Sequence, residues 1–142
     1  CILGGVHIES DLGPDGHSDA DVLIHALMDA MLGAAGLRDI GYYFPPEDDQ
    51  YKGISSMLLL EKVNFLLKER GLQAYNIDIM VISETPKLKP HIDMMKSNLQ
   101  SILEIPLDRI SIKATTNEML GAIGRREGIA AQAVVSVYEG EI

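Results

Sequence analysis

The stretch HSDADVLIHALMDAMLGAAG, residues 17–36, decides the fold because it carries the clearest periodicity in the chain. Its apolar residues recur at three- and four-residue spacing, which is typical of a helix with one buried face. Ser18 or Asp19 fits the N-cap position, and Gly36 fits the position just after the last turn. We therefore predict a helix over residues 19–35.

The rest of the chain alternates between helix and strand patterns without any internal repeat. The further helices are expected over residues 55–70 and 91–103. The strands are expected over residues 2–8, 77–81, 110–114 and 129–138, and long loops over residues 10–16 and 39–52. This order predicts one α+β domain over residues 1–142, with a small mixed four-stranded sheet and helices on one face.

Composition and charge limit the partners. The chain has 142 residues and a formal charge of −9, from 12 Lys and Arg against 21 Asp and Glu. We therefore expect a soluble domain that binds neither nucleic acid nor a membrane through general electrostatic attraction. The single cysteine, Cys1, cannot close a disulfide within the chain, which favours a reducing compartment. Because the chain begins in the middle of a strand-like pattern, we expect further sequence upstream.

The helix carries the first group of candidate functional residues. Asp21, His25 and Asp29 are spaced by four residues, so they share one stripe of a helix. Such a stripe could hold a divalent cation with His25 as a ligand, or it could be a solvated acidic face. His17 could contact a phosphate at the N-terminus of the helix, or it could be an ordinary loop histidine.

Three later segments could bind phosphates or a nucleotide. Lys113-Ala114-Thr115-Thr116-Asn117-Glu118 offers hydroxyls for phosphate and a carboxylate for Mg²⁺, or it is a plain strand end. Ser83-Glu84-Thr85-Pro86-Lys87-Leu88-Lys89-Pro90 could read a nucleobase edge, or it is a turn into a helix. The paired arginines Arg125 and Arg126 could bind a diphosphate, or they could form a salt bridge with Glu127 across a subunit contact.

Taken together, these segments resemble one family, the 2-C-methyl-D-erythritol 2,4-cyclodiphosphate synthases of non-mevalonate isoprenoid biosynthesis. The matching motifs follow the family order along the whole chain. They are residues 17–35, Asp39-Ile40-Gly41 with Phe44-Pro45, Lys52-Gly53, Pro86-Lys87 with Pro90-His91, Lys113-Ala114-Thr115-Thr116, and Gly124-Arg125 with Glu127-Gly128-Ile129-Ala130. The resemblance implies a homotrimer with three active sites between neighbouring subunits, in a bacterial cytoplasm or in a plastid.

The resemblance also implies a reaction and the residues that serve it. The substrate, 4-diphosphocytidyl-2-C-methyl-D-erythritol 2-phosphate, would be cyclised with release of CMP. His17 and Thr116 would stabilise the transition state, and Ser18 and Thr115 would assist phosphate binding. His25 would hold Zn²⁺ or Mn²⁺, and Glu118 would hold Mg²⁺ between the phosphates.

The same resemblance divides the substrate site into three parts. The methylerythritol side would include Asp39, Ile40, Gly41, Phe44 and Asp48. The cytidine diphosphate side, on the neighbouring subunit, would consist of residues 83–89 and 114–116, which include Ser83, Pro86, Lys87, Leu88, Lys89, Ala114, Thr115 and Thr116. Arg125 would lie near the trimer axis, beside a cavity that takes isoprenoid diphosphates in the family.

The chain departs from the family pattern at three places. The family completes its metal ligands with an Asp-x-His pair from an opening strand, and that strand is absent here, so His25 is the only one of the three expected protein ligands present. Pro46 stands where an acid is common, and Ala122 stands where an aromatic residue is expected. Two other interpretations therefore stay open, a trimeric nucleotide or isoprenoid diphosphate binding protein without catalysis and an unrelated metal-dependent phosphohydrolase.

Overall fold

A three-stranded mixed sheet forms the base of the computed structural model, which describes residues 1–10 and 20–140. The central strand is β3 (Leu72–Ile82), with β4 (Ile110–Thr115) parallel on one side and β5 (Ala130–Glu139) antiparallel on the other. The expected strands over 77–81, 110–114 and 129–138 are confirmed. The strand expected over residues 77–81 is longer than expected. It is β3, which already begins at Leu72, directly after the glycine that follows the preceding helix.

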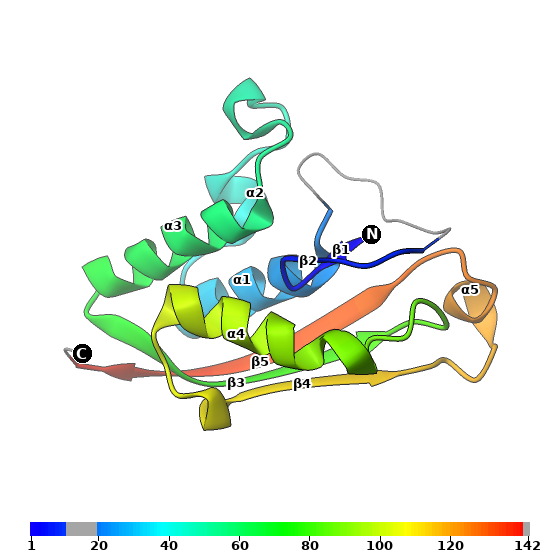
Figure 1. Cartoon of the computed structure of the whole chain (residues 1–142). Coiled ribbons are helices and arrows are strands. Elements are labelled where there is room, and N and C mark those ends of the chain that lie inside the picture. The colour runs from blue at the N-terminus through cyan, green and yellow to red at the C-terminus, as the bar shows by residue number, and fades with distance from the viewer. Residues whose placement is uncertain (11–19, 141–142) are drawn as a thin grey trace.

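Three helices cover one face of this sheet, as predicted (Figure 1). They are α1 (Val22–Ala34), α3 (Ser56–Glu69) and α4 (Ile92–Leu103). The β3 residues Ile77, Ile79 and Val81 point toward the helices and are completely buried. Alternation along the strand places the core on this side of the sheet, because successive side chains of a strand point to opposite faces.

The opposite face of the sheet carries a mixed set of side chains. Asp78 on β3 is opposite Val134 on β5 and Ser111 on β4. Val134 is 73% exposed, and Lys113 Nζ lies 3.0 Å from Asp78 Oδ1. None of the elements in residues 1–10 and 20–140 packs over this face, whose strands are the lowest layer in Figure 1.

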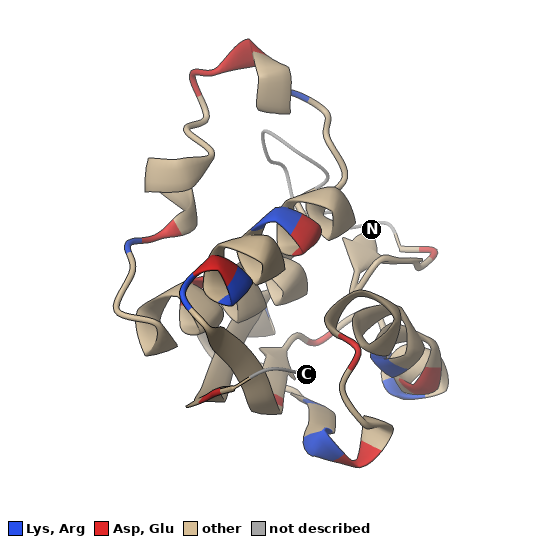
Figure 2. Ribbon diagram, turned by 90° about the vertical axis from the view of Figure 1, so that its left-hand side faces the viewer, with Lys and Arg blue, Asp and Glu red and all other residues tan. Residues whose placement is uncertain are grey.

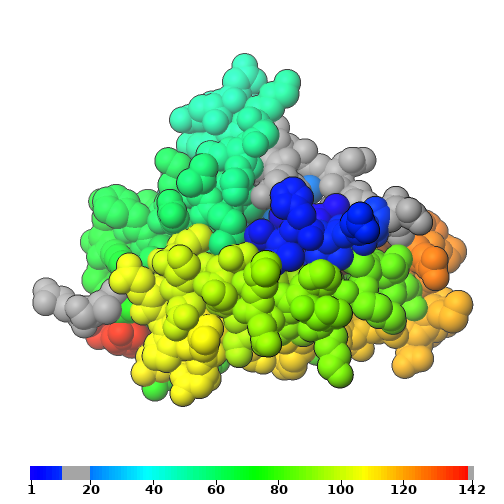
Figure 3. Space-filling view, viewed as in Figure 1, coloured from blue at the N-terminus to red at the C-terminus, as the bar shows by residue number. Residues whose placement is uncertain are grey.

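The expected fourth strand does not join the sheet. Residues 2–8 instead fold into a separate hairpin of β1 (Ile2–Leu3) and β2 (Val6–His7), where Leu3 pairs with Val6. The reason is the turn at Gly4 and Gly5, whose φ angles of +59° and +75° reverse the chain and favour glycine. Figure 3 shows this hairpin in dark blue, lying against the yellow-green surface of α4.

Helix α1 begins three residues later than the sequence predicts. Neither Ser18 nor Asp19 is its N-cap, because Asp21 takes that position and its carboxylate accepts a hydrogen bond from the Ile24 N–H. Ala20 has a φ of +58°, so the helix cannot continue back through it. Gly36, with a φ of +71°, ends the helix as expected.

The other long helices agree with the sequence prediction, whereas residues 39–52 are more structured than expected. This segment contains the short helix α2 (Ile40–Tyr43) and the 3-10 turn η1 (Asp49–Tyr51). Asp39 and Asp48 cap these two turns and thereby stabilise them. The remaining short elements are η2 (Lys89–His91), η3 (Leu107–Arg109) and α5 (Gly121–Gly124). No helix in the described part of the chain is long and apolar enough to cross a membrane.

Candidate functional site

Two hollows in the surface collect most of the residues that the sequence singles out. The first, which we call the His25 pocket, lies between α1, α2 and α3 and has a volume of about 250 Å³. Its lining consists of His25, Ile40, Gly41, Phe44, Pro46, Tyr51 and Leu59. The structure thus brings the candidate metal ligand His25 beside three of the residues expected to bind the methylerythritol half.

His25 is held in this pocket by a contact between two helices. Its Nε2 atom lies 3.1 Å from the hydroxyl oxygen of Ser56, which is completely buried at the start of α3. A hydroxyl can either donate or accept, so it suits either ring tautomer. Sequence reasoning missed Ser56, because a serine beside the N-cap Ser55 resembles an ordinary helix start.

The two aspartates of the predicted stripe have other roles. Asp21 is completely buried, and its carboxylate accepts hydrogen bonds from Gly4 N (3.0 Å) and Gly5 N (2.8 Å) as well as from Ile24 N. Asp29 accepts a hydrogen bond from Ile40 N at 2.9 Å, which joins α1 to α2. Within residues 1–10 and 20–140, no three His, Cys, Asp or Glu side chains converge on one point. The stripe is therefore a set of structural contacts, and the described residues do not make a complete metal centre.

Two other acids expected at this side flank the His25 pocket instead of lining it. Asp39 accepts a hydrogen bond from Tyr42 N at 3.1 Å, and Asp48 holds Gln50 through its backbone and side-chain nitrogens. Figure 2 shows acidic positions in red at the tip of the loop that rises above the helices, where Glu47, Asp48 and Asp49 follow one another. None of these carboxylates is among the residues that line the His25 pocket.

The second hollow, which we call the Lys87 pocket, lies where β3 and β4 end. Parallel strands finish at the same edge of a sheet, and here Ile82 is paired with Thr115. The pocket has a volume of about 150 Å³. Its lining consists of Ser83, Pro86, Lys87, Leu88, Lys89, Ala114, Thr115 and Thr116. They are eight of the ten residues expected around the cytidine diphosphate half, since Glu84 and Thr85 do not line the pocket. Both lysines are exposed in a chain that is acidic as a whole.

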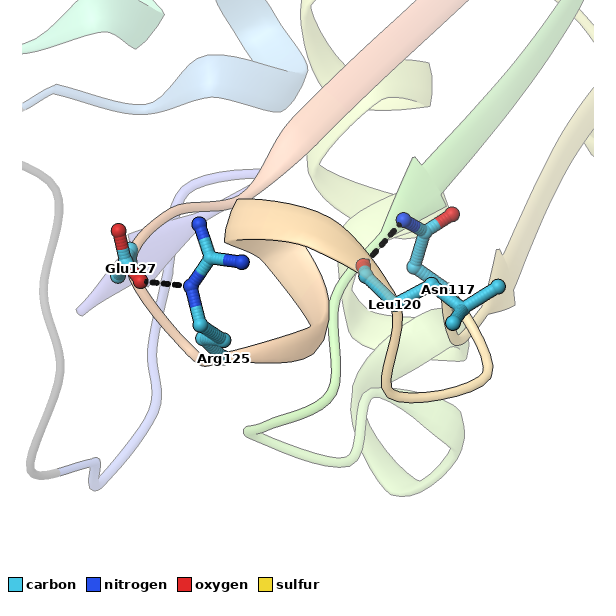
Figure 4. A network of polar contacts seen from close by, with 4 residues as sticks. All are labelled: Asn117, Leu120, Arg125 and Glu127. Atoms are coloured by element: carbon cyan, nitrogen blue, oxygen red, sulfur yellow. Dashed lines mark hydrogen bonds and ion pairs between the residues drawn. The ribbon is translucent and has the colours of Figure 1, made fainter.

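A tight turn continues the β4 side of the Lys87 pocket. Glu118 and Met119 have φ angles of 53° and 62°, a left-handed conformation that is uncommon for such residues. Asn117 closes the turn, because its side-chain nitrogen donates to the Leu120 carbonyl at 2.8 Å (Figure 4). Glu118 is exposed on this turn and does not line the pocket.

Arg125 and Glu127 form an exposed ion pair just beyond α5 (Figure 4). The salt bridge to Glu127 was expected across a subunit contact, whereas the structure forms it between two residues of the same chain. His17 and Ser18 lie outside the described residues.

The two pockets share no residue. A third hollow of about 420 Å³ lies on the outer side of α3 and has Phe44 in common with the His25 pocket. Phe65, which is exposed, also lines it, and apart from Phe44 it contains none of the predicted site residues.

Comparison with known proteins assigns the chain to a family. The chain matches the YgbB family over residues 1–138 and belongs to it. Relatives named 2-C-methyl-D-erythritol 2,4-cyclodiphosphate synthase include a protein of Synechococcus elongatus, 59% identical over 94% of this chain and 83% of its own length. Another, from Halothermothrix orenii, is 55% identical over 97% of this chain and 84% of its own length. The chain is thus an enzyme of the synthase family that its motifs resemble.

Solved structures agree with this assignment. The bifunctional IspDF protein of Campylobacter jejuni matches 99% of this chain with a TM-score of 0.95 and 44% identity, and this chain spans 38% of its length. A 2C-methyl-D-erythritol-2,4-cyclodiphosphate synthase with CDP bound matches 96% of this chain and 88% of its own, with a TM-score of 0.87 and 35% identity. The CDP complex of IspF from Plasmodium falciparum has a TM-score of 0.82 and 31% identity, covering 99% of this chain and 84% of its own.

Proposed function

We propose that this chain cyclises 4-diphosphocytidyl-2-C-methyl-D-erythritol 2-phosphate to 2-C-methyl-D-erythritol 2,4-cyclodiphosphate and releases CMP. The observation that carries this proposal is the Lys87 pocket, which gathers eight of the ten residues expected around the cytidine diphosphate half. The two structural neighbours with CDP bound support a cytidine nucleotide as its occupant.

The proposed reaction needs no nucleophile from the protein. An oxygen of the 2-phosphate forms a bond to the β-phosphorus of the same molecule. The bond from that phosphorus to its bridging oxygen breaks, and CMP leaves with that oxygen. The protein therefore has to fold a flexible anion into a reactive shape and to stabilise negative charge.

The nucleotide half of this substrate fits the Lys87 pocket. Lys87 and Lys89 supply positive charge beside the phosphates, and the hydroxyls of Thr115 and Thr116 supply hydrogen-bond donors. We assign Thr116 to the transition state because it lies at the end of β4, where the pocket meets the turn that carries Glu118. Ser83 and the backbone of residues 86–89 would contact the base.

The methylerythritol half fits the His25 pocket. Ile40, Gly41 and Phe44 give it a mainly apolar wall, which suits the methyl and methylene groups of the sugar alcohol. Asp39 and Asp48, at the rim, would accept hydrogen bonds from the hydroxyls. His17 and Ser18 are proposed to act on the phosphates from the segment that precedes α1.

Two divalent metal ions also belong to this proposal. The described residues supply only some of the ligands that each ion would need. His25 is proposed as one ligand of a Zn²⁺ or Mn²⁺ ion, and Glu118 as one ligand of a Mg²⁺ ion. Neither position gathers three His, Cys, Asp or Glu side chains among residues 1–10 and 20–140, whereas a typical catalytic zinc site has three protein ligands. The roles assigned above to the chain's own residues do not depend on either ion.

A second copy of the chain is needed to bring the two halves together. The two pockets share no residue, so one substrate would contact the His25 pocket of one subunit and the Lys87 pocket of the next. The uncovered face of the sheet, with Val134 exposed, offers a surface for this association. We propose a homotrimer with this face at its centre and with Arg125 near the axis, beside a cavity for an isoprenoid diphosphate. The single cysteine is consistent with a bacterial cytoplasm or a plastid.

Phosphorus NMR of a reaction with the purified protein tests the proposed function. With substrate and a divalent metal, we expect CMP and the cyclic diphosphate to appear in equal amounts. Release of inorganic phosphate would identify a phosphohydrolase instead. Binding of CDP without any turnover would identify a nucleotide-binding protein that has lost catalysis.

A further inference from the structure

The Lys87 pocket is built from two loops that are far apart in the sequence. One follows β3 and supplies residues 83–89, and the other follows β4 and supplies residues 114–116. A backbone hydrogen bond from Ser83 N to Thr115 O, 3.0 Å long, continues the pairing of the two strands to this point. Beyond it the loops separate, so something else has to fix the distance between them.

Glu84 makes this connection. Its Oε2 atom accepts a hydrogen bond from the backbone N–H of Asn117 at 2.6 Å, across 33 residues of sequence. A donor–acceptor distance of 2.6 Å is short for an N–H···O hydrogen bond, so the two groups are in close contact. Glu84 does not line the pocket, so the carboxylate acts on the β4 loop from outside it.

The segment that Glu84 holds is under backbone strain. Glu118 and Met119 are consecutive left-handed residues, and such a conformation persists only where neighbouring contacts enforce it. Three contacts do so here: Glu84 holds Asn117 N, Thr116 Oγ1 accepts from Glu118 N at 3.2 Å, and Asn117 Nδ2 donates to Leu120 O. Only the first of them reaches the loop that follows β3.

We propose that Glu84 is a positioning residue that sets Thr116 and Glu118 against the nucleotide side of the pocket. This inference rests on the proposed function, because it gives Glu84 a role in binding the same substrate. Glu84 contributes an acceptor oxygen on a side chain long enough to reach the Asn117 N–H. The negative charge itself opposes phosphate binding and is not what the site uses.

Three substitutions test the negative charge of the Glu84 side chain separately from its length. Glu84→Gln keeps the length of the side chain and an oxygen acceptor but removes the charge. Glu84→Asp keeps the charge but is one methylene too short to reach Asn117 N, and Glu84→Ala removes both. Glu61→Ala, at an exposed glutamate on α3, is the matched control.

Three measurements are made on each protein: the CDP dissociation constant by calorimetry, kcat and KM for the full substrate, and hydrogen exchange at the Asn117 amide. We expect Glu84→Asp and Glu84→Ala to weaken CDP binding and to lower kcat/KM, each by about tenfold, and to lose protection at Asn117. Glu84→Gln should stay within about threefold of the parent in all three. The melting temperature should be the same for Glu84→Asp, Glu84→Gln and the control.

The outcomes separate this inference from the proposed function. If the parent protein neither binds CDP nor turns over substrate, the function itself fails. If the parent is active and Glu84→Asp equals it, the function stands and the positioning role is wrong. If Glu84→Gln is as defective as Glu84→Ala, the charge is what matters, and this too overturns the role proposed here.

Discussion

The imidazole of His25 meets the hydroxyl of Ser56 at 3.1 Å, so a residue of α1 that faces a pocket is oriented by the first residue of α3. Ser56 is completely buried, and its neighbour Ser55 is the exposed N-cap of the same helix. Two adjacent serines therefore have separate tasks, one toward the pocket and one toward the helix. A pair of substitutions can distinguish them.

Ser56→Ala should lower activity by about tenfold, because an imidazole without its partner is no longer held in one orientation. Ser55→Ala should leave activity unchanged and should lower the free energy of unfolding by about 1 kcal/mol, as expected for loss of an N-cap. Steady-state assays and urea unfolding on both variants check this. Equal activities for the two variants would show that Ser56 does not orient His25.

Asp21→Asn should lower the free energy of unfolding by about 2–3 kcal/mol. The amide keeps one acceptor oxygen but places an NH₂ group against a backbone N–H, at Gly5 or at Gly4 and Ile24. Asp93→Asn, at an exposed position in the first turn of α4, should cost less than about 0.5 kcal/mol. Urea unfolding gives both values, and similar values for the two would contradict the role assigned to Asp21.

Gly124→Ala should lower the affinity for CDP by at least about tenfold, because misplacing a binding segment by an ångström is costly. A Cβ atom there would lie 2.1 Å from the carbonyl carbon of Met119, and backbone cannot move aside without shifting the turn that carries Glu118. Gly128→Ala is the control, since nothing lies within 4 Å of its added Cβ. Calorimetry with CDP on both variants measures the two affinities. An unchanged affinity for Gly124→Ala would show that this turn does not contribute to nucleotide binding.

Co-expression of His25→Ala with Thr116→Ala should restore activity that neither variant has alone. If each site takes one pocket from each of two subunits, random mixing leaves about a quarter of the sites with both pockets intact. Light scattering should give the mass of three chains for the mixture. Absence of any recovery in a mixed trimer would mean that both pockets act within one chain.

The long helices and the strands were predictable because their signals are local. Periodic apolar residues mark α1, and Gly36 and Gly71, both with a φ of +71°, mark where two helices end. The residues of the Lys87 pocket were also predictable as two short segments, and the parallel pairing of β3 with β4 brings those segments together. Resemblance to a family supplied their expected roles.

The contacts between distant segments were not predictable. The N-terminal hairpin depends on a carboxylate 17 residues away from Gly4, and no local pattern indicates that contact. The same holds for Ser56 and Glu84, whose partners are 31 and 33 residues away in sequence. A serine next to a helix cap and a glutamate in a turn look ordinary until the fold places their partners beside them.

The turn at Gly4 and Gly5 has a consequence for the order in which the molecule assembles. The hairpin has two residue pairs of its own, too few to be stable alone. It is held by Asp21, the N-cap of α1, and by Asn98 of α4, whose side chain donates to Gly4 O. It can dock only on helices that have already formed. The first ten residues should therefore be a late-folding, early-opening unit, whose amide protons exchange through local opening while the sheet beneath stays closed.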